Sequence, residues 1–394
     1  MPEAAFGRTG LGLAAVTVLN LPLGTVYAFS VFIRPLEAEL GLSRAALSFV
    51  FGLTLVGFTA GMNLAPLLYR AASAAVLTAG CAAFAAFGMA LAASATGLVQ
   101  LALGYGVLFG LGGGAAYVVL LQGMNLMLGG ARRGLANGFI VSLYPMGAMI
   151  GAPLFGWALG GFGLRATLGG LAAALLGAGL LAALLARLAG MRLEPPAGAA
   201  APQAPGQRSV FWRIWLVFFL AAAAGLTVLG QAAGMVEAYG GSTALALSAT
   251  TAITGFVAGA RIVGGWLADR IPAPRVLAFA HLLALGGGVV LLAFPAAGPA
   301  VVSLAMIGMG YGLVSGSTAA AIGIYWGAAA YGRMAGRLYA AWCVAAVTLP
   351  VLAGRLFDLT GGYAGTLAIA ATGNLLAAAI AASLPRRQPV PAPA

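Results

Sequence analysis

The chain alternates between long apolar stretches and short breaks that hold Arg, Pro or Gly, and this rhythm is its main structural signal. Each apolar stretch is long enough to cross a hydrocarbon core, which needs about 20 helical residues. The pattern predicts twelve transmembrane helices, at residues 10–33, 45–69, 72–93, 96–127, 135–160, 165–188, 211–238, 244–268, 275–295, 298–326, 334–357 and 363–384.

Composition agrees with an all-α membrane protein. Of the 394 residues, 62% are hydrophobic and only 7% are charged, whereas a water-soluble domain carries charge over roughly a quarter to a third of its surface. The sequence shows no nucleophile–base pair, metal-ligand cluster or cofactor motif. We therefore expect neither an enzyme nor a cofactor.

The net charge of +12 comes from 19 Arg and no Lys. With the N-terminus inside, fourteen Arg fall on the cytoplasmic side and four, Arg34, Arg44, Arg165 and Arg355, on the other. Arg-rich cytoplasmic loops are the rule in bacterial-type inner membranes. The charge thus predicts two cytoplasmic termini and does not indicate nucleic-acid binding.

A Pro-, Ala- and Gly-rich segment at residues 194–209 cannot continue a helix. It predicts an N-terminal bundle of six helices at residues 1–190, a cytoplasmic linker at 191–210 and a C-terminal bundle of six helices at 211–394.

The two halves repeat one another. Gly-Phe-Thr-Ala-Gly at residues 57–61 matches Gly-Phe-Val-Ala-Gly at residues 255–259. Repeats of this kind build transporters that rock around a central site. In this alignment Arg261 stands opposite Asn63, so the charge belongs to one half only.

Arg261 is a permanent positive charge in a predicted membrane helix, where it costs at least ~2.5–3.5 kcal/mol. Asp269 is eight residues on, about 12 Å along a helix axis, and the other acids lie in loops or near predicted helix ends. We expect Arg261 to bind an anionic substrate. The structural alternative is an Arg that pairs with helix carbonyls or with an acid.

Gly-Gly-Trp-Leu-Ala-Asp-Arg at residues 264–270 resembles the loop signature of the major facilitator superfamily. Gly264 and Gly265 would let two helices approach closely, and Asp269 and Arg270 would pair at the cytoplasmic rim or cap helix ends. The first-half counterpart, residues 63–70, lacks the acid.

Further patches resemble the oxalate:formate antiporter family and the related monocarboxylate transporters. They lie at residues 24–36, 110–117, 132–138, 151–154 and 224–230. The resemblance implies that Arg261 binds the substrate carboxylate. Dicarboxylate-handling members carry a second cation, a Lys, where this chain has Trp342, so one carboxylate is expected rather than oxalate. Animal-type monocarboxylate transporters have an Asp where this chain has Val257, so that acid of proton coupling is missing.

The resemblance also places Tyr27 and Tyr117 on the cavity wall, where a phenol offers a hydroxyl to a carboxylate oxygen; core packing is the alternative. Further candidates for the wall are Asn63, Tyr144, Tyr311, Tyr339 and Trp342. Glu237 is a candidate for proton coupling if it is buried, or else an exposed carboxylate at the membrane rim.

We therefore predict a monomeric secondary transporter of small organic monocarboxylates, working by alternating access as a proton symporter or an anion exchanger. Its expected partners are the organic acid, the lipid bilayer, and protons or a counter-anion. One alternative is an exporter of drugs or other hydrophobic solutes, in which Arg261 only tethers helices. A second is a membrane sensor or scaffold that transports nothing.

Overall fold

The computed structural model describes residues 2–128, 132–194 and 207–386, and the described residues form helices and short connections without strands. They cluster into two compact units. Unit 1 draws on residues 1–128, 143–201 and 326–337, and unit 2 on residues 129–142, 202–325 and 338–394.

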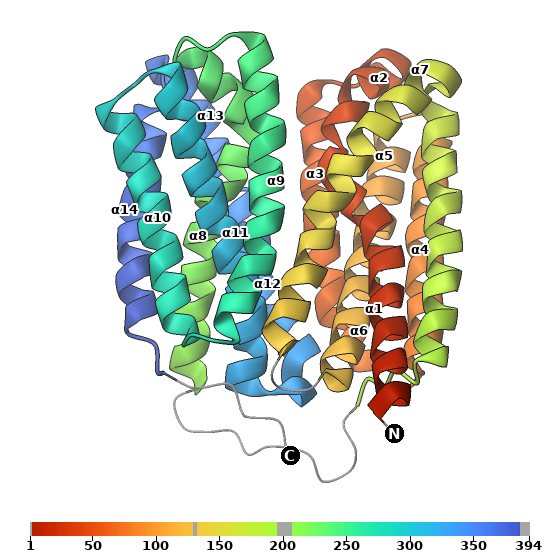
Figure 1. The fold of residues 1–394 in the computed structure, drawn as a ribbon. Helices are drawn as coiled ribbons and strands as arrows, with labels where there is room; N and C mark the ends of the chain where they lie inside the picture. Colours follow the sequence, from red (N-terminus) through yellow and green to blue (C-terminus); the bar gives the residue numbers. More distant parts are fainter. Residues whose placement is uncertain (1, 129–131, 195–206, 387–394) are drawn as a thin grey trace. The chain divides into compact units, whose positions relative to one another are not determined.

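Most elements of the first half belong to unit 1, and in Figure 1 α1, α3, α4 and α6 run side by side. They are α1 (Pro2–Gly24), η1 (Thr25–Ala28), α2 (Ser30–Leu40), α3 (Arg44–Leu64), η2 (Ala65–Leu68), α4 (Ala74–Ala93), α5 (Leu98–Leu101), the π-helical η3 (Ala102–Phe109), α6 (Gly110–Met127) and α7 (Arg133–Leu188).

The second half supplies most of unit 2, where α10 and α14 pack side by side (Figure 1). Its elements are α8 (Gln207–Ala238), α9 (Thr243–Ala268), α10 (Ala273–Ala293), α11 (Ala297–Trp326), η5 (Ala328–Ala330), α12 (Tyr331–Ala346), α13 (Leu349–Thr360) and α14 (Ala364–Ala382). Two helices contribute to both units. The first residues of α7 belong to unit 2 and the rest to unit 1, whereas the first residues of α12 belong to unit 1 and the rest to unit 2.

The twelve predicted spans are confirmed once α7 is divided. Within the described residues, eleven helical segments are long and apolar enough to cross a membrane, and α7 is the longest at 56 residues. A helix of that length would extend about 84 Å, far beyond a hydrocarbon core of about 30 Å. Gly163, with φ 79° and ψ 176°, breaks α7 into the two predicted spans.

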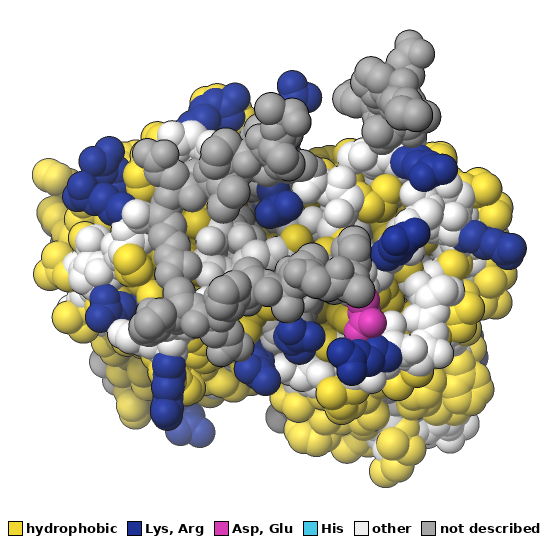
Figure 2. Space-filling view, turned by 90° about the horizontal axis from the view of Figure 1, so that it is seen from below, with side chains coloured by type: hydrophobic (Ala, Val, Ile, Leu, Met, Phe, Trp, Pro, Cys, Tyr) yellow, Lys and Arg dark blue, Asp and Glu magenta, His cyan; other side chains and the backbone are white. Residues whose placement is uncertain are grey.

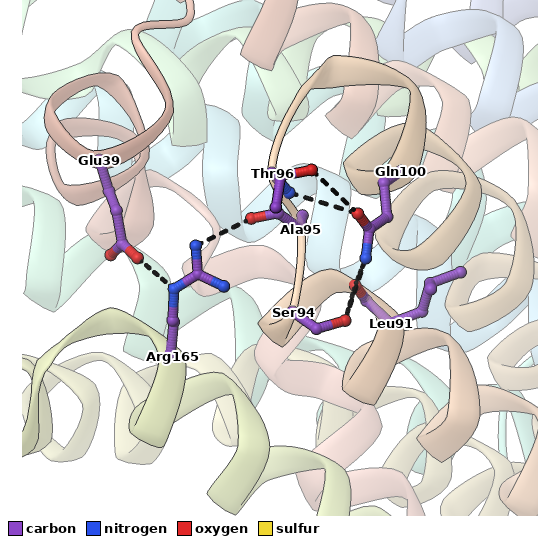
Figure 3. Close-up of polar contacts among 7 residues, drawn as sticks. All are labelled: Glu39, Leu91, Ser94, Ala95, Thr96, Gln100 and Arg165. Carbon is purple, nitrogen blue, oxygen red and sulfur yellow. Dashed lines mark hydrogen bonds and ion pairs between the residues drawn. The ribbon is translucent and has the colours of Figure 1, made fainter.

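A polar cluster fixes the second part of α7 within unit 1 (Figure 3). Two residues after the break, Arg165 donates to Glu39 of α2 at 2.5 Å and to the carbonyl of Ala95 at 3.2 Å. Gln100 of α5 stabilises the loop that contains Ala95. The amide nitrogen of Gln100 donates to the Ser94 hydroxyl and to the Leu91 carbonyl. The cluster thus ties together three elements that are far apart in the sequence.

The Arg side chains are unevenly distributed. Figure 2 views the end of the helices where α1 begins, and dark-blue Arg side chains lie at many places on that face with little magenta acid beside them. One acid paired with this Arg set is Glu194, at 2.9 Å from Arg70. The positive-inside pattern predicts that this end faces the cytoplasm, and cytoplasmic termini remain a prediction.

Glycines allow α6 to pack directly against two neighbours. A Cβ added at Gly110 would lie 2.5 Å from the carbonyl oxygen of Thr54 in α3, and one at Gly114 would overlap the carbonyl of Phe58. On another face, a Cβ at Gly112 would lie 2.6 Å from the backbone nitrogen of Ala85 in α4. Small residues at such contacts stabilise membrane helices by letting their backbones approach.

We expect Gly114→Ala to lower the free energy of unfolding by about 1–3 kcal/mol, because the added methyl group must displace the α3 backbone. Gly80→Ala in α4 is the matched control, since a Cβ there meets nothing within 4 Å and alanine raises helix propensity by up to about 1 kcal/mol. Thermal unfolding in detergent measures both. Equal melting temperatures for the two variants would contradict the packing account.

Candidate functional site

Arg261 lies in α9 with only 4% of its surface exposed. One guanidinium nitrogen, Nη1, donates to the carbonyl of Val141 in α7 at 2.7 Å, and Nη2 donates to the hydroxyl of Tyr311 in α11 at 3.1 Å. The guanidinium carbon also lies 5.3 Å from the centroid of the Tyr311 ring, within the range of a cation–π contact. The Arg261 side chain therefore connects three helices of unit 2.

The Tyr311 ring is held in place by a glycine of α8. A Cβ at Gly225 would overlap the Tyr311 ring, so the absence of a side chain at Gly225 makes room for it. Trp342 of α12 also interacts with Tyr311. Gly225, which belongs to the patch at residues 224–230, thus makes room for the phenol that contacts Arg261.

The backbone of Arg261 is also closely packed. A Cβ added at Gly138 of α7 would lie 2.5 Å from the carbonyl oxygen of Arg261, and one at Gly316 of α11 would overlap the same oxygen. Helices α7 and α11 therefore approach α9 at the level of Arg261, with glycine at both contacts.

Three of the predicted tyrosines meet in unit 1, and Phe58 of α3 lies beside two of them. The Tyr144 ring makes edge-to-face contacts with Tyr27, Phe58 and Tyr117, at centroid distances of 6.2, 5.5 and 5.3 Å. Tyr117 and Tyr144 are buried, and Tyr27 is partly exposed. We call Tyr27, Phe58, Tyr117 and Tyr144 the aromatic cluster.

The other predicted wall residues lie elsewhere. Tyr339 packs on Phe218 of α8, with ring centroids 5.4 Å apart. Asn63 is exposed and donates its amide to the carbonyls of Thr59 and Gly336, at 2.8 and 3.0 Å. Asn63 thus binds the first turns of α12 rather than joining the aromatic cluster.

Glu237, the predicted candidate for proton coupling, is exposed at the end of α8. An exposed carboxylate was the alternative to proton coupling for Glu237. Coupling through Glu237 would need its burial in another conformation, and that role stays a prediction.

Asp269 caps the start of α7. Its two carboxylate oxygens accept from the backbone N–H groups of Gly134 and Leu135, at 2.7 and 2.8 Å. A carboxylate at a helix N-terminus interacts favourably with the helix dipole, and bonds to a charged acceptor are strong. Partial burial raises the pKa of the Asp269 carboxyl, and the two N–H bonds oppose that rise.

Of the other residues of the loop signature, Gly265 takes part in this same contact with α7. Gly265 lies against Gly134, where any side chain would overlap the α7 backbone, and Gly264 lies against Leu313 of α11. Arg270 turns back onto its own helix, donating to the Trp266 carbonyl and lying 4.1 Å from the Trp266 ring. Asp269 is therefore the residue of this signature that caps α7.

Unit 1 contains a corresponding contact made by a neutral side chain. The Gln122 oxygen, in α6, accepts from the N–H of Gly332 at 2.6 Å, near the start of α12. Its amide nitrogen donates to the carbonyls of Leu193 and Ala328. The start of α12 is thus held by an amide, and the start of α7 by a carboxylate.

Sequence reasoning missed Phe58, Gln122 and Val141. Gln122 had a detectable signal, since it is an amide within a long apolar stretch. In the sequence, Phe58 cannot be distinguished from an aromatic residue that faces lipid. Val141 could not be found because it contributes only its backbone carbonyl, which every residue has.

An ionisable side chain buried in a membrane-spanning segment, as Arg261 is, marks a functional site by default. The family model of the Major Facilitator Superfamily matches residues 13–336. The chain therefore belongs to the Major Facilitator Superfamily, a family of multi-pass transporters.

Relatives and solved structures agree with this assignment. The chain is 26% identical over 304 residues to YhjX of Escherichia coli, an uncharacterized MFS-type transporter, with 75% of each chain covered. Its fold is similar to that of FucP in the outward conformation, at a TM-score of 0.70 and 15% identity, with 94% of this chain and 97% of FucP covered. The proton:xylose symporter XylE also gives a TM-score of 0.70 at 15% identity, with 96% and 95% covered. At such low identity the two solved structures establish the fold alone.

We expect Asp269→Ala to destabilise the start of α7 by about 1–2 kcal/mol, because two helix N–H groups lose their acceptor. Hydrogen exchange at Gly134 and Leu135 should become faster, and Asp269→Asn should have a smaller effect. Arg275→Ala is the control, since Arg275 is an exposed Arg of α10. Equal exchange rates in Asp269→Ala and Arg275→Ala would show that the cap contributes nothing.

Proposed function

We propose that this member of the superfamily is a secondary transporter of small organic monocarboxylates and that Arg261 binds the substrate carboxylate. The observation that carries the proposal is the Arg261 guanidinium, which is buried in a membrane-spanning helix and donates to a peptide carbonyl and a phenol. A carboxylate is a stronger acceptor for a guanidinium than either neutral group, and it can take two parallel N–H bonds.

The phenols support an organic anion. Tyr311 already places its hydroxyl next to the guanidinium, so it could donate to the second oxygen of a bound carboxylate. The aromatic cluster of unit 1 offers further apolar ring surface, of the kind that the organic part of a substrate contacts.

The charge at the site favours one carboxylate. Trp342 stands where the dicarboxylate-handling relatives have Lys, and in this chain it interacts with Tyr311. A second carboxylate beside Arg261 would have to lose its hydration without gaining a second cation there, which is costly in a membrane interior.

Transport by alternating access belongs to this proposal, as proton symport or anion exchange. A bound carboxylate that neutralises Arg261 lowers the cost of closing the site away from water. Location in a bacterial-type inner membrane, with both termini in the cytoplasm and a monomeric state, completes the proposal.

The competing candidate is an exporter of hydrophobic solutes, which the aromatic cluster would also suit. In that case Arg261 would serve only to tether α9 to α7 and α11.

We expect Arg261→Ala to reduce uptake of the transported acid by about 30-fold or more, since loss of a buried charged partner costs at least about 2 kcal/mol. Arg261→Lys should retain part of the uptake, because Lys keeps the charge but not the two-pronged geometry. Uptake of labelled acid into proteoliposomes measures this.

The matched control is Arg355→Ala, at an exposed Arg of α13. Wild-type uptake in Arg261→Ala, with normal thermal stability, would reject carboxylate binding by Arg261 and favour the exporter.

We expect at least one monocarboxylate among formate, acetate, lactate and pyruvate to stabilise the purified protein more than oxalate does. The physical reason is the single cation that Arg261 offers. A thermal-shift screen at equal concentrations checks the order. Stronger stabilisation by oxalate than by every monocarboxylate would overturn the argument for one carboxylate.

A further inference from the structure

The carbonyl that accepts from Arg261 is one that a proline has released. In an α-helix the carbonyl of residue 141 would accept from the N–H of residue 145. Residue 145 is Pro145, which has no N–H and whose ring crowds the carbonyl four residues earlier. Among the residues of α7, only Gly163 departs from helical backbone angles, so the helix continues through Pro145 with the Val141 carbonyl deprived of its helix donor.

A freed carbonyl within the membrane must find another donor, because lipid offers none. Arg261 supplies it at 2.7 Å, through a charged donor that makes a stronger bond than the missing amide. The Val141 carbonyl therefore regains a donor, and the Arg261 guanidinium gains an acceptor.

The surrounding packing directs Arg261 to this carbonyl. Gly138 and Gly316 bring the backbones of α7 and α11 against the carbonyl of Arg261. Tyr311, seated on Gly225, contacts the guanidinium through its hydroxyl and its ring. The guanidinium is thus held by one fixed phenol and one released carbonyl.

We propose that Pro145 is a positioning residue of the substrate site: it frees the Val141 carbonyl, which holds Arg261 in the ligand-free chain and gives up the guanidinium N–H when a carboxylate arrives. The substrate part of this inference rests on the proposed function, whereas the ligand-free part does not.

This exchange has two consequences. The carboxylate must displace an acceptor that is already well placed, so the carbonyl lowers the affinity for substrate. Binding also removes the hydrogen bond from Arg261 of α9 to Val141 of α7, while the cap by Asp269 on Gly134 and Leu135 remains.

The ligand-free test is a double-mutant cycle on the full-length protein, with Pro145→Ala, Arg261→Gln and the double variant. Pro145→Ala restores an N–H for the Val141 carbonyl. The fall in melting temperature caused by Arg261→Gln should therefore shrink by at least half in the Pro145→Ala background. Additive shifts would overturn the proposal. If Pro145→Ala does not fold, Pro145→Leu restores the same N–H and must give the same coupling.

The second test measures the Kd of the best-bound monocarboxylate by calorimetry. Pro145→Ala weakens the competing acceptor, so the Kd should fall by about 3- to 10-fold. Pro153→Ala is the matched control, because Pro153 is the other proline in α7 and the carbonyl it frees, at Met149, is not the acceptor of Arg261. A purely structural role for Pro145 would leave the Kd unchanged or raise it.

The outcomes separate the two hypotheses. The inference is supported if the melting-temperature shifts of the double-mutant cycle are non-additive and the Kd falls in Pro145→Ala but not in Pro153→Ala. An unchanged Kd, or an equal fall in Pro153→Ala, overturns the displacement step. If no acid of the panel binds the wild-type protein, the proposed function fails, and the ligand-free cycle still decides whether Pro145 positions Arg261.

Discussion

The structure of unit 2 depends on how a guanidinium is accommodated in an apolar interior. Arg261 cannot lose its proton, so its N–H groups need acceptors that neighbouring helices must bring to it. A peptide carbonyl from α7 and a phenol from α11 do so. Each acceptor is available because of a second residue: Pro145 frees the carbonyl, and Gly225 makes room for the phenol. The glycines of α7, α9 and α11 bring the helices close enough for these contacts.

The same stretch of α7 is held at its first turn by Asp269, so two kinds of polar contact join α9 to α7. The comparable contact at the start of α12 relies on Gln122, whose amide both donates and accepts. The first-half counterpart of the loop signature, residues 63–70, has no acid. The start of α12 is instead held by a neutral amide, Gln122, which lies on another helix, α6. Protonation and salt weaken a cap made by a carboxylate but not one made by an amide. The stability of the start of α7 should therefore depend on pH and ionic strength, whereas that of the start of α12 should not.

Much of the fold could be predicted from the sequence, because a membrane helix must satisfy its own backbone over about 20 apolar residues. That single constraint located all twelve spans, including the two that meet at Gly163 within α7. The family could also be predicted, from the loop signature at residues 264–270.

The site was less predictable, because its geometry arises from contacts between helices. The five predicted tyrosines do not form one group: Tyr27 and Tyr117 meet at Tyr144, Tyr311 joins Arg261, and Tyr339 packs on Phe218. Asn63, by contrast, binds α12. Sequence reasoning offered carbonyl pairing as the structural alternative to anion binding at Arg261. The released carbonyl of Val141 suggests that the two are successive states of one residue.

The central claim is that Arg261 exchanges a peptide carbonyl for a substrate carboxylate. Isotope-edited infrared difference spectroscopy of a bound acid, labelled with ¹³C at its carboxyl carbon, tests it most directly. The account predicts a shifted carboxylate band in the wild-type protein together with a change in the amide band of a ¹³C-labelled Val141 carbonyl, both lost in Arg261→Gln. A bound acid whose carboxylate band is the same in both proteins, with no change at Val141, would contradict it.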